Sequence, residues 1–185
     1  MNASAALQLE TPRLRLREFV VDDAPFVMQL LNEPSFIEFI GDKGVRSRSD
    51  AERYLTEGPI SSYRRYGHGL LHVSLKNDGE PIGMCGLVKR DTLPYPDIGF
   101  ALLPHFWNRG YVTEAARAAM LHGQAALGMQ TILGITTPGN VRSIAVLQKL
   151  GLSFVEERPL GDRPEVLKIF SLSVESAAQQ RPRTP

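Results

Sequence analysis

The chain has 185 residues, of which 43% are hydrophobic and 22% charged, so it is long enough for one domain with a buried core and too apolar for wholesale disorder. The 21 Lys and Arg residues balance 20 Asp and Glu residues, which gives a net charge of +1 and no indication of a nucleic-acid or membrane partner. The single cysteine excludes an internal disulfide, and the absence of a signal peptide or a long apolar run favours a soluble, cytoplasmic protein.

Two helices are predicted after an opening strand. Leu14 and Leu16 alternate with Arg13, Arg15 and Arg17, a pattern typical of a strand with one buried face. A first helix should begin at Asp22–Asp23, where carboxylates suit a helix N-terminus, and should end at Pro34. A loop is expected from Ser35 to Arg48, and a second helix follows, capped by Ser49 or Asp50 and interrupted at Pro59.

The rest of the chain alternates strands and helices. Strands are predicted at 68–76, 81–89, 97–103, 131–136, 153–157 and 165–173, and helices at 113–127 and 140–150. The β-α-β unit over 97–136 should be parallel and right-handed, with antiparallel hairpins on either side. The expected fold class is therefore α/β (α+β), with a mixed sheet of about seven strands and helices on both faces. A single domain should span 9–173, with 1–8 and 175–185 as flexible ends.

The most informative stretch joins a strand to a helix between Leu103 and Ala115, through a turn with one glycine, Gly110. Such a turn directs several backbone N–H groups outward at a helix N-terminus, where they can hold a phosphate. Arg109 adds a cation, and Gly110 allows close approach to the backbone. Neither G-x-G-x-x-G nor a P-loop motif occurs in the chain. The alternative is a plain strand-to-helix connection that binds nothing.

A family resemblance favours the ligand-binding interpretation. The segment Trp107–Ala115, WNRGYVTEA, resembles the acetyl-CoA pyrophosphate loop of GCN5-related N-acetyltransferases (GNATs), whose general pattern is Q/R-x-x-G-x-G/A. It is most similar to the RimJ/RimL branch, which acetylates ribosomal-protein N-termini and often has W-G-K-G-Y-A-T-E-A. Val112 departs from the small residue usual at that place. Residues 9–17, 81–87 and 140–154 also resemble segments of this branch, so the resemblance covers 9–173.

The resemblance implies an N-acetyltransferase that moves an acetyl group from acetyl-CoA to a primary amine by direct attack on the thioester. The strand before the loop should splay from its parallel neighbour, so that its backbone binds the pantetheine arm and polarises the acetyl carbonyl, an effect of roughly 3–4 kcal/mol. The resemblance implies that Asn140 forms a hydrogen bond to the pantetheine arm. Asn140 is equally suited to be the N-cap of a helix. The implied cofactor-binding residues are Phe100, Ala101, Leu102, Asn108, Arg109, Gly110, Tyr111, Val112, Thr113, Asn140 and Ser143.

Three residues are candidates for proton transfer. Members of the family often protonate the leaving thiolate with a Tyr seven residues after the Asn, but this chain has Leu147 there, which leaves Ser143 as the candidate acid. Ser143 equally suits the first turn of a helix. Asp97 opens the strand that should carry the acetyl group, and Glu38 lies in the segment that lines the acceptor cleft in the family. Either is a candidate general base, and either equally suits a solvated carboxylate.

Other reactive side chains indicate structural roles. The four histidines show no metal-ligand spacing, so no metal site is expected. His72 lies among apolar strand residues and is interpreted as a core histidine. Cys85 lies between small and apolar residues, with no feature that would lower the pKa of its thiol, and is interpreted as a packing residue.

The acceptor is left open between a protein N-terminus and a small-molecule amine. Its groove should come from Phe36–Arg48 and Pro159–Pro164, where Arg46 and Arg48 either attract an acidic acceptor or belong to a solvated loop. A homodimer is also left open. The alternative function is a non-catalytic acetyl-CoA-binding or regulatory module, because Leu147 and Val112 replace residues usual in the family.

Overall fold

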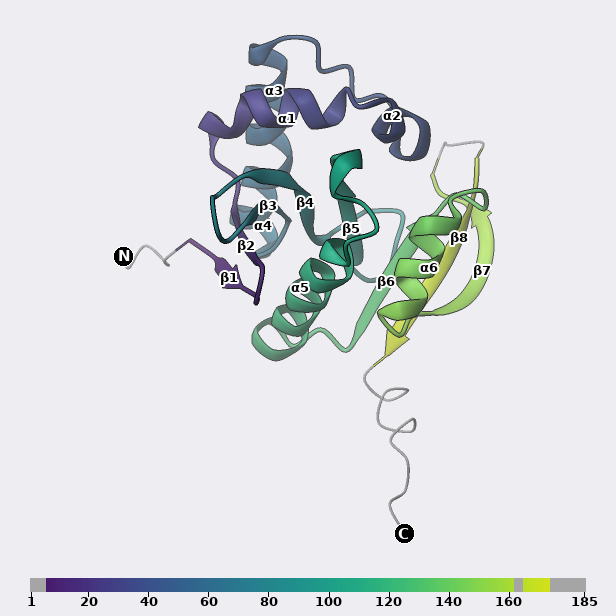
Figure 1. Ribbon diagram of the computed structural model, residues 1–185. Coiled ribbons are helices and arrows are strands. Elements are labelled where there is room, and N and C mark those ends of the chain that lie inside the picture. Colours follow the sequence, from purple (N-terminus) through teal and green to yellow (C-terminus); the bar gives the residue numbers. More distant parts are fainter. Residues whose placement is uncertain (1–5, 162–164, 174–185) are drawn as a thin grey trace.

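The computed structural model describes residues 6–161 and 165–173, which form an eight-stranded sheet with the order β1-β2-β3-β4-β5-β6-β8-β7 (Figure 1). The parallel pair β5–β6 lies within an otherwise antiparallel sheet, and the structure thus confirms the predicted mixed sheet. The strands are β1 (Gln8–Glu10), β2 (Leu14–Glu18), β3 (Leu70–Leu75), β4 (Pro81–Val88), β5 (Asp97–Leu102), β6 (Thr131–Thr136), β7 (Ser153–Pro159) and β8 (Val166–Ser173).

Helices cover both faces of the sheet, as predicted. His72 on β3 packs against Phe26 of α1, whereas Leu87 on β4 lies against Gly123 of α5. His72 pairs with Met84, and Leu87 is three residues further along β4, so His72 and Leu87 point to opposite faces. The helices are α1 (Ala24–Leu31), α2 (Pro34–Ile40), α3 (Arg48–Leu55), α4 (Ser61–Tyr66), α5 (Tyr111–Leu127) and α6 (Val141–Lys149).

The predicted opening strand is confirmed as β2, but the resembling segment Leu9–Arg17 is not one strand, because it folds back on itself. Gln8 pairs with Arg17, so β1 and β2 form an antiparallel hairpin. Thr11 closes the turn, since its N–H donates to Leu14 O and its Oγ1 accepts from Leu14 N, both at 2.9 Å. Pro12 follows Thr11 and cannot donate to a strand ladder, which favours a turn here.

The predicted loop from Ser35 to Arg48 was also partly wrong. Pro34 occupies the first turn of α2, where a missing N–H costs nothing, so it begins a helix as well as following one. The α3 N-cap is Ser47, whose hydroxyl accepts from Asp50 N at 3.1 Å while the Asp50 carboxylate accepts from Ser47 N at 3.0 Å. The predicted interruption at Pro59 is confirmed, because Thr56–Ile60 is a π-helical segment.

Parts of the predicted flexible ends lie outside the described residues, namely 1–5 of the first and all of 175–185. Residues 162–164 of the predicted acceptor segment also lie outside them. The domain limits of 9–173 therefore stay a prediction. Within the described part of the chain, no helix is both long enough and apolar enough to cross a membrane.

Candidate active site

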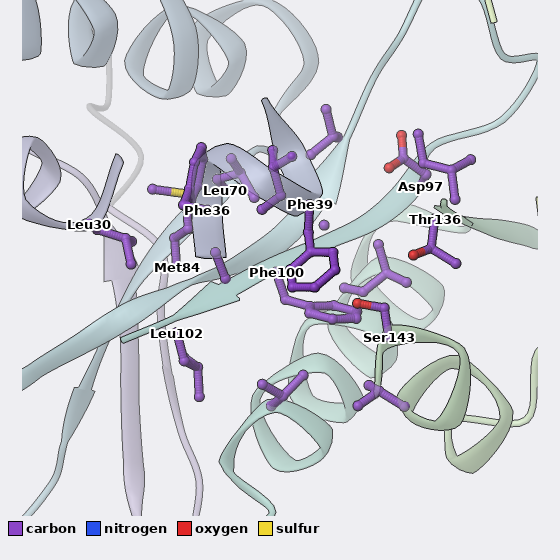
Figure 2. A pocket seen from close by; sticks show the side chains of 18 of the residues that line it. Leu30, Phe36, Phe39, Leu70, Met84, Asp97, Phe100, Leu102, Thr136 and Ser143 are labelled. Carbon is purple, nitrogen blue, oxygen red and sulfur yellow. The ribbon is translucent and has the colours of Figure 1, made fainter. Parts of the chain in front are cut away.

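A cavity of about 860 Å³ opens between β5 and β6 and continues beneath α2 (Figure 2). Its β5 side is lined by β5 itself, by the turn before α5, by the end of β6 and by the start of α6. Its α2 side is lined by α1, α2, β3, β4 and the segment from the end of α3 to the end of α4, residues 54–66, here called the α3–α4 segment. Most of the predicted site residues lie on the β5 side.

The parallel strands β5 and β6 separate almost as soon as they meet. Their ladder consists of the single pair Asp97–Leu133, supported by a hydrogen bond of 2.9 Å from Leu133 N to Pro96 O. Beyond this point the two strands diverge toward their carboxyl ends, with Ile135 and Thr136 lining the far wall of the cavity. The structure thus confirms the splayed parallel pair.

The direction of each backbone group on β5 follows from its two neighbours. Pro96 O accepts from β6, whereas Leu103 N donates to Ile82 O on β4 at 2.9 Å. Backbone groups alternate sides along a strand, so even-numbered residues of β5 face the gap and odd-numbered residues face β4. Phe100 and Leu102 therefore present backbone groups to the gap.

The remaining backbone groups at this edge are few. Ala101 lines the cavity, but its N–H and C=O turn toward β4. The indole Nε1 of Trp107 donates to Leu102 O at 2.8 Å, which occupies that carbonyl and fixes the turn to the end of β5. Both backbone groups of Phe100 and the N–H of Leu102 are left for a ligand that would extend along β5.

The turn before α5 has the geometry of an anion-binding site. Gly110 is the N-cap of α5 with φ of 78°, and Asn108 has φ of 60°, the one positive φ among non-glycine residues described. The first helical hydrogen bond runs from Glu114 N to Gly110 O, so the N–H groups of 111–113 have no partner inside the helix. Asn108, Gly110 and residues 111–113 all line the cavity. Free N–H groups and the helix dipole together favour a phosphate here.

The β1–β2 hairpin forms hydrogen bonds to this turn and to the first turn of α5. The Glu114 carboxylate accepts from Thr11 Oγ1 at 2.6 Å, from Arg13 N at 3.0 Å and from Arg13 Nε at 2.7 Å. Arg13 also donates to Arg109 O at 2.9 Å, and its guanidinium lies 4.5 Å from the centre of the Tyr111 ring. Burial acts to raise the pKa of the Glu114 carboxyl, but the hydrogen bonds from Thr11 and Arg13 outweigh it and hold the pKa below its ordinary value.

The cation that accompanies the turn differs from the one predicted. The Arg109 guanidinium lies 5.8 Å from the Phe106 ring centre, and Arg109 is not among the residues that line the cavity. Arg142 of α6 lines the cavity instead, with its guanidinium 4.9 Å from the Trp107 ring centre. Arg142 follows Asn140 by two residues within the predicted α6 motif, a position that could have identified it.

The start of α6 brings Asn140 and Ser143 to the cavity. Asn140 caps the helix, since its Oδ1 accepts from Ser143 N at 3.1 Å. Figure 2 shows the Ser143 hydroxyl directed toward the region of the Phe100 ring. Leu147 is 1% exposed and packs on β6, where a Cβ at Gly134 would lie 2.4 Å from Leu147 Cδ2. The side chain at position 147 therefore faces the core and not the cavity. Ser143 is the residue of α6 that brings a hydroxyl group to the cavity wall.

The two candidate bases occupy different surroundings. Asp97 is 1% exposed, lines the cavity where β5 and β6 meet, and pairs with Arg90 through Oδ1–Nε at 2.7 Å and Oδ2–Nη2 at 3.3 Å. Burial raises the pKa of the Asp97 carboxyl, and Arg90 partly opposes this effect. Glu38 is exposed on α2 and does not line the cavity.

The α2 side was not predicted in its details. Its apolar and aromatic lining consists of Leu30, Phe36, Phe39, Ile40, Tyr54, Pro59, Tyr66, Leu70 and Met84, its charged lining of Glu33, Lys43, Glu57, Arg65 and Lys89, and its hydroxyl lining of Ser35, Ser61 and Ser62. Arg46 and Arg48 contribute nothing to it, because they pair with Asp42 and Glu52 at the surface. Phe36, Phe39, Ile40 and Lys43 lie within the predicted acceptor segment Phe36–Arg48, whereas the other residues come from separate elements that share no local motif.

The structural roles of His72 and Cys85 agree with the sequence interpretation. His72 lies between the rings of Phe19 and Phe26, and burial lowers the pKa of its imidazole to about 4. Cys85 is fully buried, and burial raises the pKa of its thiol. The described residues contain no cluster of three or more His, Cys, Asp or Glu side chains suited to a metal ion.

Comparison with known proteins identifies the domain. Residues 13–153 match the model of a family described as the acetyltransferase (GNAT) domain. The chain is 28% identical over 156 residues to the uncharacterized protein YkkB of Bacillus subtilis, an alignment that covers 83% of this chain and 88% of YkkB. It is 25% identical over 146 residues to the uncharacterized N-acetyltransferase YnaD of the same organism, which covers 79% of this chain and 82% of YnaD.

Solved structures share the fold. An acetyltransferase from Agrobacterium tumefaciens superposes with a TM-score of 0.77 at 24% identity, over 93% of this chain and 97% of the other. The ribosomal L7/L12 acetyltransferase RimL, solved in complex with coenzyme A, superposes with a TM-score of 0.71 at 14% identity, over 92% and 99% of the two chains. At these identities the likeness shows a common architecture.

Proposed function

Because this chain belongs to the GNAT acetyltransferase family, we propose that it transfers the acetyl group of acetyl-CoA to the nitrogen of a primary amine. The observation that carries the proposal is the splayed β5–β6 pair, whose open backbone edge leads directly into the anion-binding turn at Gly110. Such an edge and turn suit a ligand with an extended amide-containing arm and a diphosphate, which is the chemistry of acetyl-CoA. The coenzyme A complex of RimL, which has the same fold, supports this assignment.

The proposed cofactor contacts follow from the geometry. The N–H groups of 110–113 and the Arg142 guanidinium would bind the diphosphate. The Phe100 C=O and the Leu102 N–H would bind the pantetheine amides as an added strand, and Asn140 also lines the cavity. A backbone N–H near the junction of β5 and β6, such as that of Phe100, would then polarise the thioester carbonyl, an effect of roughly 3–4 kcal/mol.

The transfer requires two proton movements, for which Asp97 and Ser143 are the proposed groups. The amine nitrogen forms a bond to the acetyl carbon as the carbon–sulfur bond breaks. Asp97 would accept the proton that the amine gives up, through a water molecule, because burial already raises the pKa of this carboxyl. Ser143 would donate to the departing thiolate, either directly or by orienting a water. Arg90 would hold the Asp97 carboxylate in place through its two contacts.

The experiment that tests this proposal is amine-dependent release of coenzyme A. Purified protein is supplied with acetyl-CoA and a set of primary amines, and the free thiol is measured with a chromogenic disulfide. Cys85 is buried and should add little background. Thiol release that rises with amine concentration supports the transfer. Binding of acetyl-CoA without amine-dependent release would instead support the non-catalytic module and overturn the transfer.

A further inference from the structure

The α2 side of the cavity points to the chemical class of the acceptor. We infer that the acceptor is a small primary amine with a single positive charge and an apolar or aromatic body, seated between α2, the α3–α4 segment and the β3–β4 strands. This inference rests on the proposed function, because it takes the β5 side to be occupied by acetyl-CoA. The α2 side is then the part of the same cavity that remains for the amine.

The apolar residues of the α2 side form a continuous lining next to the reacting end of the cofactor site. Phe39, Phe36, Met84 and Leu30 line the same cavity as Phe100 and Ser143 (Figure 2). These side chains come from α1, α2, β4 and β5, so tertiary packing rather than one local motif creates the lining. An amine that reaches the thioester near Phe100 would rest its body on them.

Burial of these side chains favours an apolar body over a peptide. Leu30, Phe36 and Met84 are 1%, 5% and 2% exposed and form the base of the cavity wall, whereas the half-buried Phe39, Ile40 and Leu70 present apolar surface that a ligand can cover. A hydrocarbon or ring placed there gains about 25 cal/mol for each Å² removed from water. A peptide brings an N–H and a C=O with every residue, and the hydroxyls of Ser35, Ser61 and Ser62 are few partners to replace the water hydrogen bonds that these groups lose.

The charges on the α2 side favour a singly charged acceptor. Glu33 and Glu57 are matched by Lys43 and Arg65, and a further cation lines this side, Lys89, whose Nζ donates to the backbone carbonyls of Arg90 and Leu93. The Asp97–Arg90 pair at the junction of β5 and β6 cancels in the same way. A polycationic acceptor needs an excess of carboxylates, and an acidic peptide needs an excess of cations. A lining with one surplus cation among the described residues lacks the carboxylates that a polycation needs and the cluster of cations that an acidic peptide needs.

The same apolar lining assists the chemistry. An ammonium group that enters an apolar site loses hydration, and this loss lowers its pKa and favours the neutral, nucleophilic amine. The demand on a general base such as Asp97 is correspondingly smaller. An apolar acceptor itself promotes this loss of hydration, because its body excludes water from the cavity around the amine.

The test compares acceptors of matched reactivity by thiol release from acetyl-CoA. The panel contains 2-phenylethylamine, a tetrapeptide that begins with Phe, an acidic tetrapeptide that begins with Ser, and the polycation kanamycin. We expect kcat/KM for 2-phenylethylamine to exceed those of the acidic peptide and kanamycin by about 100-fold or more, as in sites that discriminate by an apolar pocket. A higher kcat/KM for the Phe tetrapeptide would overturn the small-molecule assignment in favour of a protein N-terminus. Preference for the acidic peptide or kanamycin would overturn the inference outright.

Two variants of one helix provide the matched control. Phe39→Ala removes a ring from the lining, whereas Ile37→Ala removes an exposed side chain of the same helix that does not line the cavity. Phe39→Ala should lower kcat/KM for 2-phenylethylamine by about tenfold or more. Ile37→Ala should leave it unchanged, and the Kd for acetyl-CoA should stay the same in both variants. Equal kcat/KM in the two variants would overturn the inference.

Calorimetry separates this inference from the proposed function. If the protein binds acetyl-CoA but 2-phenylethylamine adds nothing to the rate of thiol release, the acceptor inference fails while the cofactor site stands. If well-folded protein does not bind acetyl-CoA, the proposed function itself fails.

Discussion

Glu114 in the first turn of α5 and Arg13 in the β1–β2 hairpin form an ion pair at 2.7 Å, although 101 positions separate them in the sequence. The same Arg13 donates to Arg109 O, so one side chain contacts both the helix and the turn that begins it. The N-terminal hairpin is therefore part of the proposed diphosphate site without lining it.

Removal of the Arg13 guanidinium should weaken cofactor binding. In Arg13→Gln the turn loses its contacts to the Glu114 carboxylate and to Arg109 O, so the N–H groups of 110–113 should lose their fixed direction. The Kd for acetyl-CoA should rise about tenfold, equivalent to about 1.4 kcal/mol, while kcat at saturating acetyl-CoA changes little. Arg15→Gln on the same strand, which breaks an exposed pair with Glu10 at 3.4 Å, is the control. An unchanged Kd in folded Arg13→Gln would contradict this role.

The two ends of α5 allow a matched test of Gly110. Gly110 and Gly128 have φ of 78° and 66°, so alanine at either position should cost about 1 kcal/mol of stability. Only Gly110 lines the cavity, and a Cβ there would lie 3.4 Å from the Arg13 guanidinium. Calorimetric titration should show weaker acetyl-CoA binding in Gly110→Ala alone. Equal affinities in the two variants would remove the turn from the cofactor site.

The two candidate bases can be separated by isosteric amides. Asp97→Asn keeps the shape of a buried side chain but cannot accept a proton, so turnover should fall by about 100-fold, the lower range for loss of a general base. Glu38→Gln should leave turnover unchanged, because Glu38 is exposed outside the cavity. Thermal unfolding of each variant reports any loss of fold from the unpaired Arg90. The opposite ranking of the two rates would exclude Asp97 as the base.

Ser143 should affect the reaction more than the binding of the cofactor. Ser143→Ala removes the hydroxyl from the cavity wall and keeps the N–H that Asn140 accepts, so α6 should stay capped. We expect kcat to fall about tenfold or more with the Kd for acetyl-CoA nearly unchanged. If kcat stays at the wild-type value, Ser143 has no part in thiolate protonation, and a water molecule protonates the thiolate without its help.

His72 should make the fold sensitive to mild acid. Its imidazole pKa is lowered to about 4 in the folded protein from an ordinary value of 6.5, chiefly by burial, with Arg17 acting in the same direction and Asp23 against it. The unfolded chain therefore binds a proton first, and stability should fall by about 3 kcal/mol as the pH drops from 6.5 to 4. This contribution fades as the pH rises through and above 6.5, because the imidazole of the unfolded chain then becomes neutral as well.

The variant His72→Leu checks this prediction. Leu cannot titrate, and it removes a buried Nδ1 that has no hydrogen-bond partner in the described residues. Denaturant unfolding at several pH values should show a stability advantage of His72→Leu over wild type that grows as the pH falls. A difference that is independent of pH would show that His72 does not titrate in this range.

The sequence predicts the parts of this site that lie within one continuous motif. The Gly110 turn and the Asn140–Ser143 helix start each occupy a few neighbouring residues, and both reach the cavity. The Arg13–Glu114 pair could not be predicted, because its members meet only when the hairpin packs on α5. The orientation of Ala101 toward β4 likewise depends on which strand pairs with each edge of β5, which no pattern along β5 records.

The α2 side shows the same limit more strongly. The sequence predicts a loop at Phe36 and Phe39, because Pro34 indicates the end of one helix, whereas it also begins α2. Glu38 then seemed suited to the cleft, whereas the helical period turns it away from the face that carries Phe36, Phe39 and Ile40. A correct helix assignment would have placed the apolar face of α2 on the cavity.

The central claim is that the splayed β5–β6 pair and the Gly110 turn bind acetyl-CoA. The most direct test is a calorimetric titration of purified, coenzyme-free protein with acetyl-CoA, with ATP and NAD as controls. The account predicts binding of acetyl-CoA with a Kd in the micromolar range, about −8 kcal/mol, and no comparable binding of the two controls. Well-folded protein that binds no acetyl-CoA, or that binds all three ligands equally, would contradict it.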